Sequence, residues 1–446
     1  MPARSRHFRR RQPFEHDHSL ILERADGPVG FFNPTRAHFL YSTVSRVKEQ
    51  IEKEVQDTDD AVRDGVKEEK REHKSPEAAK NVRFLWRSRD NRKGRHALLV
   101  QRPAPGEESS FLAPRSTSDP REILRNVKRT LTYFPFWDIS WLVAFIFTWG
   151  SVVWVINGFF AWLPLEAPST EFHNEILYGG GITAFIGAII FFETGSILLI
   201  IEAVNVDHAG CFGWAVEQLM DEQRGGGGKA KYRLKPSKSH CRHHHQNRHN
   251  FVGKSAAAAI EQHTGLAEEK SEQEQDRQWQ WFPSWHDLRT HYLHELGFLA
   301  GAAQLFGATV FGVSGFTALP GINDRLSPQS ALNGAYWIPQ VIGGSGFIVS
   351  STLYMLETQS KWYKPAFKIL GWHIAFWNLI GAIGFTLCGA LGMAYGNSGA
   401  QYQASLATFW GSWAFLIGSY LQLYESLDKH PVEETSKKEK LRQSNK

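Results

Sequence analysis

The feature that most constrains this chain is a pair of short patterns that occurs three times in the same order. The first pattern is Gly-small-x2-aromatic-x3-Gly, and the second is Phe-x2-small-Ser-x-Leu-x3-Glu. The first pattern begins at Gly150, Gly307 and Gly381, and the second begins at Phe192, Phe347 and Phe415. Identical internal spacing in three ordered copies indicates a repeated two-helix hairpin.

Each copy lies in a stretch that is apolar enough to cross a lipid bilayer. A span of about 20 apolar residues covers roughly 30 Å of hydrocarbon. Segments of that order occur at 139–163, 180–202, 296–319, 336–357, 369–392 and 405–425. The mean hydropathy of −0.34 resembles that of a soluble protein only because the charged residues are confined to other segments. We therefore expect an all-α polytopic membrane helix bundle, with six transmembrane helices arranged as three pseudo-repeated hairpins.

The alternation of polar and apolar composition divides the chain into six regions. We expect a cytoplasmic, mostly disordered N-terminal region (1–133), helical hairpins at 134–203, 291–358 and 359–426, a flexible His-rich cytoplasmic insert (204–290) and a cytoplasmic tail (427–446). Within the first region, aliphatic residues recur in steps of 7 and 4 along 43–70. That stripe fits a helix on a membrane surface or against another helix, but a marginal helix in solvent is the favoured interpretation.

Basic residues are concentrated on one side of the expected spans. Lysine and arginine precede the first span and follow the fourth and the sixth. In the connections after spans one, three and five, the one lysine or arginine is Arg325. Cytoplasmic loops carry an excess of these residues, so both termini are expected in the cytoplasm. The basic start of the chain is not followed by an apolar signal-peptide segment, so we expect the first span to act as the signal anchor.

The repeated residues are expected to serve helix packing first. In each copy the two glycines lie four residues before and four residues after the aromatic residue, which places all three on nearly one helix face, where the glycines allow a neighbouring backbone to approach closely. These glycines are Gly150, Gly158, Gly307, Gly315, Gly381 and Gly389. On the second helices, the small residue and the acid of each copy are seven apart and again share a face.

The repeated acids Glu202, Glu357 and Glu425 fall at the cytoplasmic ends of the second helices, where the helix dipole disfavours negative charge. Lys361 and Lys429 follow two of them by four residues, a favourable order for an ion pair. Glu202 has no such lysine, which leaves it freer for another role.

A further acid, Glu193, lies about 13 Å deeper along its helix than Glu202. The other two copies have Ile348 and Leu416 at this position, so the repeat does not require a carboxyl there. An intramembrane acid faces a bundle interior or a water cavity by default. Two interpretations stay open for Glu193: an ion, proton or polar-solute path, or a protonated side chain hydrogen-bonded to a neighbouring helix.

Three amide side chains are candidate neighbours of this acid. They are Asn157, Gln304 and Asn378. Asn157 occupies the repeat position of Ser314 and Cys388, while Gln304 and Asn378 occupy the same position in the second and third copies.

No enzyme class, cofactor or metal is indicated. The run from His240 to His249 is interrupted by arginines and lacks a second ligand cluster at a zinc spacing, so a basic loop is favoured over a metal site. The chain has no P-loop, nucleophile elbow, zinc-protease or dinucleotide motif. Three cysteines cannot form a disulfide framework. The net charge of +5 is explained by topology and anionic lipid rather than by nucleic acid.

The second helix of the third copy, Phe415 to Glu425, resembles the YrhK-like membrane module, a two-helix unit of unknown function. As a whole the chain is similar to uncharacterised multi-pass membrane proteins of filamentous fungi. The resemblance covers the three hairpins and implies a membrane fold without implying an activity. Copy two departs from the motif with Ser350 in place of glycine.

Two function classes follow from the sequence. The first is a transporter- or channel-like bundle for a small solute or ion, with Glu193 and the amides on its path. The second is a non-transporting scaffold or adaptor, whose cytoplasmic segments bind protein partners. The lipid bilayer is the expected partner in both classes, and the oligomeric state is undetermined. A water-filled cavity that reaches Glu193 would distinguish the first class from the second.

Overall fold

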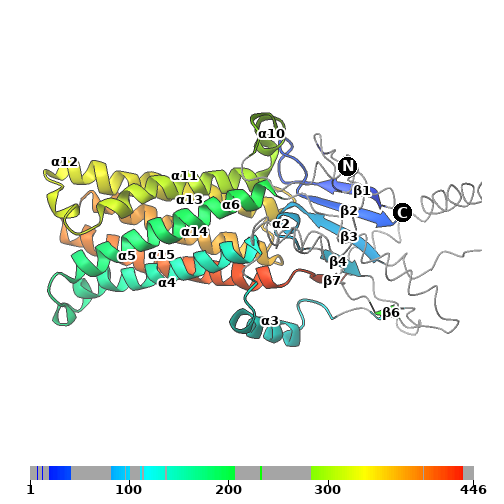
Figure 1. The fold of residues 1–446 in the computed structure, drawn as a ribbon, viewed down its shortest axis with the longest axis horizontal. Helices are drawn as coiled ribbons and strands as arrows, with labels where there is room; N and C mark the ends of the chain where they lie inside the picture. The colour runs from blue at the N-terminus through cyan, green and yellow to red at the C-terminus, as the bar shows by residue number, and fades with distance from the viewer. Residues whose placement is uncertain are drawn as a thin grey trace, which may run out of the picture.

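A computed structural model describes residues 8, 13, 20–41, 82–95, 97–100, 111–112, 115–135, 138–205, 232–233, 283–394 and 396–434. Over these residues the protein is an elongated bundle of helices with a small β-sheet at one end (Figure 1). Strands from near both ends of the chain lie in that one sheet. The sheet covers one end of the bundle, and the opposite end carries loops and short helices.

Six long helical rods build the bundle. Four rods are single helices: α4 (Ile139–Glu166), α11 (Leu296–Thr317), α14 (Leu370–Gly392) and α15 (Ser398–Leu427). The second rod along the chain is continuous through η3 (Ile176–Gly180), α5 (Gly181–Phe185), η4 (Ile186–Glu193) and α6 (Thr194–Val204). The fourth rod is continuous through α12 (Gln329–Leu332), η8 (Asn333–Trp337) and α13 (Ile338–Thr358). The segments η3, η4 and η8 are π-helical. Such wider turns occur frequently at functional sites.

Four of the six rods are long and apolar enough to cross a membrane: Ile139–Glu166, Ile176–Val204, Leu296–Thr317 and Leu370–Gly392. The sequence predicted six spans, and α13 and α15 do not reach the same mean hydropathy. Their hydropathy is lowered by serine, glutamine and glycine residues on their inner faces. These include Ser350, Ser351, Ser412, Ser419 and Gln422, all of which are buried.

The rods form a closed ring. Going around it, α4 packs on the η4–α6 segment, which packs on α11, and α11 packs on α13. The ring continues through α14 and α15, and α15 returns to α4. Each rod therefore has two neighbours, and the inner faces of all six meet along one axis.

The outer face of the ring is apolar. Exposed aliphatic and aromatic side chains occur on every rod. Examples are Trp149 on α4, Ile197 on α6, Phe306 on α11, Val349 on α13, Leu387 on α14 and Trp413 on α15. A water-soluble monomer rarely exposes so continuous an apolar surface. The surface therefore fits a lipid environment.

The expectation of a mostly disordered N-terminal region is wrong for two of its segments. Strands β1 (Leu20–Asp26), β2 (Arg36–Tyr41), β3 (Val82–Arg87) and β4 (Ala97–Val100) form an antiparallel meander. The tail likewise contributes β7 (Val432–Glu434), which pairs with β4 in parallel. In β2 the buried residues Ala37 and Phe39 alternate with the half-buried Arg36 and His38. Because the strands are short and lie among charged residues, their alternation is hard to recognise in the sequence.

Shorter elements connect these parts. Helix α3 (Pro120–Thr132) leads into α4, and α10 (Trp285–Thr290) with η6 (Tyr292–His294) leads into α11. Strands β5 (Phe111–Leu112) and β6 (Tyr232–Arg233) pair with each other. The loops far from the sheet contain η2 (Pro168–Thr170) and η7 (Asn323–Arg325). The helix expected at 43–70, the His-rich run and most of the insert lie outside the described residues.

One short helix decides how the sheet meets the bundle. Helix α2 (Ser88–Arg92) interrupts the β3–β4 connection and contacts α11 and α13. The sheet also contacts the bundle through Asn33, whose backbone nitrogen and side chain reach His294 and Glu295 ahead of α11. Arg36 donates to the backbone oxygen of Thr358 at the end of α13. The sheet is therefore fixed at several points to the ends of the helices.

Candidate functional site

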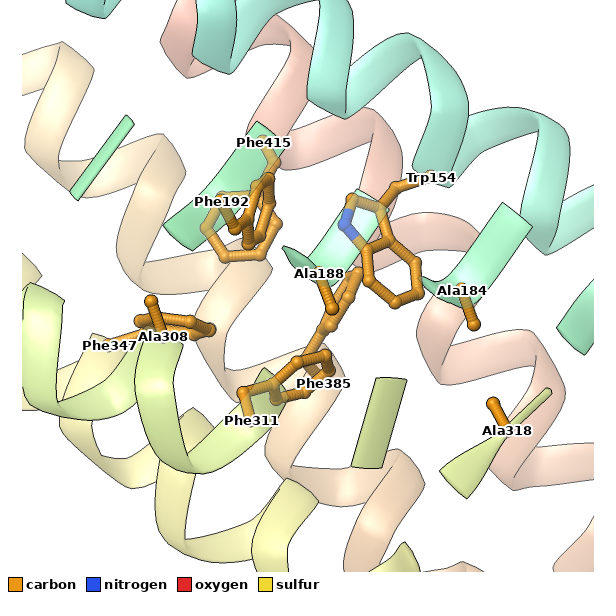
Figure 2. Packing of buried hydrophobic residues seen from close by; sticks show 11 residues of the cluster. Trp154, Ala184, Ala188, Phe192, Ala308, Phe311, Ala318, Phe347, Phe385 and Phe415 are labelled. Atoms are coloured by element: carbon orange, nitrogen blue, oxygen red, sulfur yellow. The ribbon is translucent and has the colours of Figure 1, made fainter. Parts of the chain in front are cut away.

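The centre of the bundle is filled by six aromatic rings, one from each rod (Figure 2). Trp154, Phe311 and Phe385 form one triangle, with ring centroids 4.8 to 5.7 Å apart. Phe192, Phe347 and Phe415 form a second triangle, with centroids 5.6 to 6.4 Å apart. Each ring of the first triangle also contacts a ring of the second at 5.2 to 5.9 Å. We call these six residues the aromatic layer.

The glycines of the repeat make this convergence possible. A side chain at Gly150, Gly307 or Gly381 would overlap the second helix of the same hairpin, at Phe191, at the backbone oxygen of Gly343 or at Phe415. The second glycine of each copy instead lies against another hairpin. Gly158 meets Phe409 on α15, Gly315 meets Ala188 on η4, and Gly389 meets Val341 on α13. All six glycines therefore lie at close helix contacts.

A large cavity lies on the side of the aromatic layer remote from the sheet. Its volume is about 640 Å³, and Trp154 and Phe311 of the first aromatic triangle line its floor. The exposed residues Glu171 and His173 line its rim. The π-helical turns η3 and η8 contribute to its wall. This outer cavity is in the size range of small-molecule sites.

A small cavity lies on the other side of the layer, towards the sheet. Its volume is about 50 Å³, and Phe192 and Phe415 of the second aromatic triangle line it. The other lining residues are mostly polar, with side chains from α2, α6, α11, α13, α14 and α15. The two cavities lie on the bundle axis, and the aromatic layer separates this inner cavity from the outer one.

The polar residues singled out from the repeat fall into these two cavities by position. Asn157 lines the outer cavity with Ser314 and Cys388, and it donates to Gly180 O at 2.7 Å and to Thr183 Oγ1 at 3.0 Å. Gln304 and Asn378 line the inner cavity. The structure thus places Gln304 and Asn378, which share one repeat position, in the same cavity. The aromatic layer separates both of them from Asn157.

Glu193 lies elsewhere. Thr309 Oγ1 on α11 donates to Glu193 Oε1 at 2.9 Å, so the carboxyl bonds to a neighbouring rod. Neither cavity has Glu193 among its described lining residues. The arrangement matches the geometry of a glutamate hydrogen-bonded to an adjacent helix, and the three amides are not its partners among the interactions of the described residues.

The three repeated acids meet at the sheet end of the axis, where all three are buried: Glu202, Glu357 and Glu425 are 1%, 2% and 1% exposed. Helix α2 and the residues after it contact all three. Arg92 makes a two-bonded ion pair with Glu357, at 2.6 and 2.8 Å. Arg89 makes one with Glu425, at 2.7 and 3.3 Å.

Two further side chains complete this pairing. Ser88 Oγ donates to Glu357 Oε1 at 2.6 Å, and Arg95 Nη1 donates to Glu425 Oε1 at 3.2 Å. Glu202 is held more loosely, since Lys93 Nζ and Arg92 Nε are each 3.9 Å from its oxygens. We call α2 together with Lys93 and Arg95 the basic plug.

The first helices of two hairpins make room for the plug. Gly297 on α11 and Gly371 on α14 lie directly against the guanidinium groups of Arg92 and Arg89, and a Cβ at either glycine would overlap them. Both glycines occur ten residues before the first glycine of their repeat. The close approach lets each arginine reach the buried carboxylate behind it.

The surroundings of the basic plug shift the pKa values of Arg92 and Lys93 in opposite directions. Burial alone would lower the pKa of Arg92, but the charge and hydrogen bonds of Glu357, together with smaller contributions from Tyr354 and Glu202, raise that pKa above its ordinary value. Burial lowers the pKa of Lys93 to about 8, and the charge of Glu202 only partly offsets this effect. The two arginines are thus firmly charged, while Lys93 can lose its proton under mildly basic conditions.

The basic plug was not predicted from the sequence. Its signal is the spacing Arg89-x2-Arg92-Lys93, which places three cations on one face of a helical turn. Three acids buried at equivalent positions require three cations, and this is the cluster that supplies them. Among the described residues, no group of histidine, cysteine and acidic side chains has the geometry of a metal site.

No protein-family model, curated protein or solved structure matches this chain. Its function is therefore inferred from the geometry of its own residues.

Proposed function

We propose that the chain is a six-span membrane protein of three repeated hairpins, and that the axis between the hairpins is a closed pathway for a small ion or solute. The observation that carries the proposal is the pair of axial cavities on either side of the aromatic layer. The resemblance of the hairpins to the YrhK-like module stays a prediction.

The six-span reading is supported by the outer surface of the two more polar rods. Ile342 and Val349 on α13 and Trp413 and Ile417 on α15 are exposed, as are the apolar residues of the four long apolar helices. A helix that is apolar outside and polar inside fits a membrane bundle that encloses a polar axis.

The repeat reading is supported by contacts that recur around the ring. The second glycine of hairpin one packs on hairpin three, that of hairpin two on hairpin one, and that of hairpin three on hairpin two. Each hairpin also supplies one ring to each aromatic triangle and one acid to the sheet end. These relations are those of a threefold pseudo-symmetric assembly.

The direction of the pathway follows from charge. The sheet end carries the basic segments that predict a cytoplasmic side, so the outer cavity would open to the opposite compartment. Three carboxylates at the cytoplasmic mouth would favour cations, as acidic rings do in cation channels. With the basic plug seated, its arginines and lysine neutralise the acids and close this mouth.

The pathway has two closures in series, and the test opens both. Phe385→Ala widens the aromatic layer, and Arg89→Glu with Arg92→Glu places like charges against Glu425 and Glu357 to expel the plug. In sealed vesicles loaded with a pH- or potassium-sensitive dye, the triple variant should conduct cations at least tenfold faster than the wild type.

Matched controls come from the same elements. Phe306→Ala removes an exposed ring from α11, and Arg24→Glu reverses an exposed charge on the sheet. Vesicles with these two changes should stay as tight as wild-type vesicles. If the triple variant is folded and its vesicles also stay tight, the pathway is refuted.

The second candidate is the scaffold. Two observations favour it. Neither cavity has Glu193 among its described lining residues, although a cavity that reaches Glu193 is expected for a transporter. The two closures are also complete, since the rings of the aromatic layer are at most 7% exposed. A scaffold predicts that no combination of these variants conducts, and that the sheet end captures protein partners through surfaces other than the basic plug. The vesicle experiment therefore separates the two functions.

A further inference from the structure

The three acids at the sheet end are not equivalent. Glu357 and Glu425 each accept short hydrogen bonds at both oxygens. Neither oxygen of Glu202 accepts a hydrogen bond from a protein group in the described parts of the chain, although the residue is 1% exposed. Lys93 Nζ, 3.9 Å away, likewise donates none to such a group.

Other groups around the same cavity share this property. Ser350 Oγ, Tyr354 OH and Arg92 Nε are buried without a hydrogen-bonding protein group among the described residues. All of them belong to residues that line the inner cavity, together with Lys93 and Glu202. An unsatisfied buried polar group costs about 1–3 kcal/mol, so a cluster of them indicates a site that binds polar molecules.

The size and charge of the cavity define what it can bind. A volume of about 50 Å³ has room for about three water molecules, at roughly 15 Å³ of accessible volume each. Lys93 repels metal cations, and Glu202 repels anions. A neutral ion pair with a gap between its members instead suits water, which donates to the carboxylate and accepts from the ammonium.

We infer that the inner cavity is a proton-exchange site, in which water joins Lys93 Nζ to the Glu202 carboxylate, and that the proton is the ion the pathway carries. This inference rests on the proposed function. In the exchange, an N–H bond of Lys93 breaks and its proton passes to water. That water gives up another proton to Glu202, where an O–H bond forms. The exchange leaves the total charge of the cluster unchanged and needs no other reactant.

The surroundings make Lys93 the group that gives up a proton. Its pKa is lowered by burial, and by Arg89 and Arg92 on its own element, while Glu202 and Glu425 oppose the shift. The charged and titratable groups that face the pair from the packed elements are Arg89, Arg92, Tyr354, Glu357 and Glu425. Glu357 and Glu425 are bound to arginines on both oxygens, so Glu202 is the acid placed to accept.

Infrared difference spectra of the full-length protein in lipid, taken between pH 6 and pH 10, test the site directly. A carboxylate band that shifts in D₂O, because water is bonded to it, and that changes as Lys93 loses its proton at a pKa of about 8 should be present in the wild type and absent from Glu202→Gln. Glu193→Gln is the matched control, since it removes a different carboxyl on the same rod, and it should keep the band. Lys93→Met should keep the band and remove its dependence on pH, because the neighbouring ammonium group is lost.

A flux measurement distinguishes the two proposals. The single variant Phe385→Ala opens the aromatic layer and leaves the basic plug, and with it Lys93, in place. Adding Glu202→Gln to this variant should reduce its proton flux at least tenfold, and adding Glu193→Gln should leave the flux unchanged. If the band is unaffected by Glu202→Gln and proton flux persists, the exchange site is refuted while the pathway stands. If the band depends on Glu202 but the opened variant carries no current, the exchange site stands and the pathway is refuted.

Discussion

At the scale of single residues, the glycines beside the basic plug are the positions least able to change. A methyl group at Gly297 would overlap the guanidinium of Arg92, which is held by Glu357. Gly297→Ala should therefore lower the free energy of unfolding by about 1–3 kcal/mol, as overpacking does. Thermal unfolding in detergent measures the change.

The control lies one turn further along the same helix. A methyl group at Gly301 would meet its nearest neighbours at ordinary contact distances of 3.4 Å and above. Gly301→Ala should be neutral or stabilise the protein by up to about 1 kcal/mol, because alanine is the better helix former. Equal losses from the two substitutions would show that the plug does not occupy this position.

The burial of Lys93 gives a pH dependence of known sign. Its pKa is lowered from 10.5 to about 8 by burial, so between these values the unfolded chain binds a proton that the folded protein has released. The unfolding free energy should therefore rise with pH across that window, by up to about 3 kcal/mol. Thermal unfolding of the wild type should show this rise, and Lys93→Met should lack it. A wild type that loses stability between pH 8 and 10 relative to Lys93→Met would contradict the assignment.

The candidate site was only half visible in the sequence. The acids Glu202, Glu357 and Glu425 stand out because they repeat, and a role for Glu202 beyond that of the other two stays a prediction. Their partners lie more than 100 residues earlier, in a region whose charge suggested disorder. Sequence periodicity reports contacts along one helix, and it does not report a pairing between a loop and a distant bundle.

At the scale of elements, the aromatic layer is both the core of the bundle and the barrier on its axis. Phe385 is fully buried, and its ring contacts Trp154, Phe311 and Phe415. Phe385→Ala should cost about 3–5 kcal/mol of unfolding free energy, because it leaves a cavity between packed rings.

The matched change is on the outer face of α11. Phe306 is 58% exposed, so Phe306→Ala should change the unfolding free energy in detergent by less than about 1 kcal/mol. Similar losses for the two variants would mean that the layer does not pack as described.

The sequence predicts the helices better than the strands. A threefold pattern over apolar stretches fixes six helical rods, and four of them meet the length and hydropathy of a membrane span. The strands β4 and β7 are 4 and 3 residues long and are separated by more than 300 residues. Such short strands carry too little periodicity to be recognised, and their pairing depends on the folded bundle.

At the scale of the whole molecule, the sheet end and the far loops should lie on opposite sides of the membrane. Asp324→Cys lies in the loop of η7, and His286→Cys lies on α10 beside the sheet. In oriented vesicles, a membrane-impermeant thiol reagent should label one of these from outside and the other only after the vesicles are opened. Labelling of both from the same side would contradict the six-span arrangement.

The central claim is that the aromatic layer separates the outer cavity from the inner cavity on the axis of the bundle. The most direct test places a single cysteine on each side of it, at Ser314 in the outer cavity or at Ser351 in the inner cavity, after Cys211, Cys241 and Cys388 are replaced by serine. The membrane-impermeant thiol reagent is added on the side of the membrane remote from the sheet, where the outer cavity opens. It should label Ser314→Cys quickly, and it should label Ser351→Cys only when Phe385→Ala is also present. Equal labelling of the two cysteines with the aromatic layer intact, or no labelling of Ser314→Cys at all, would contradict the account.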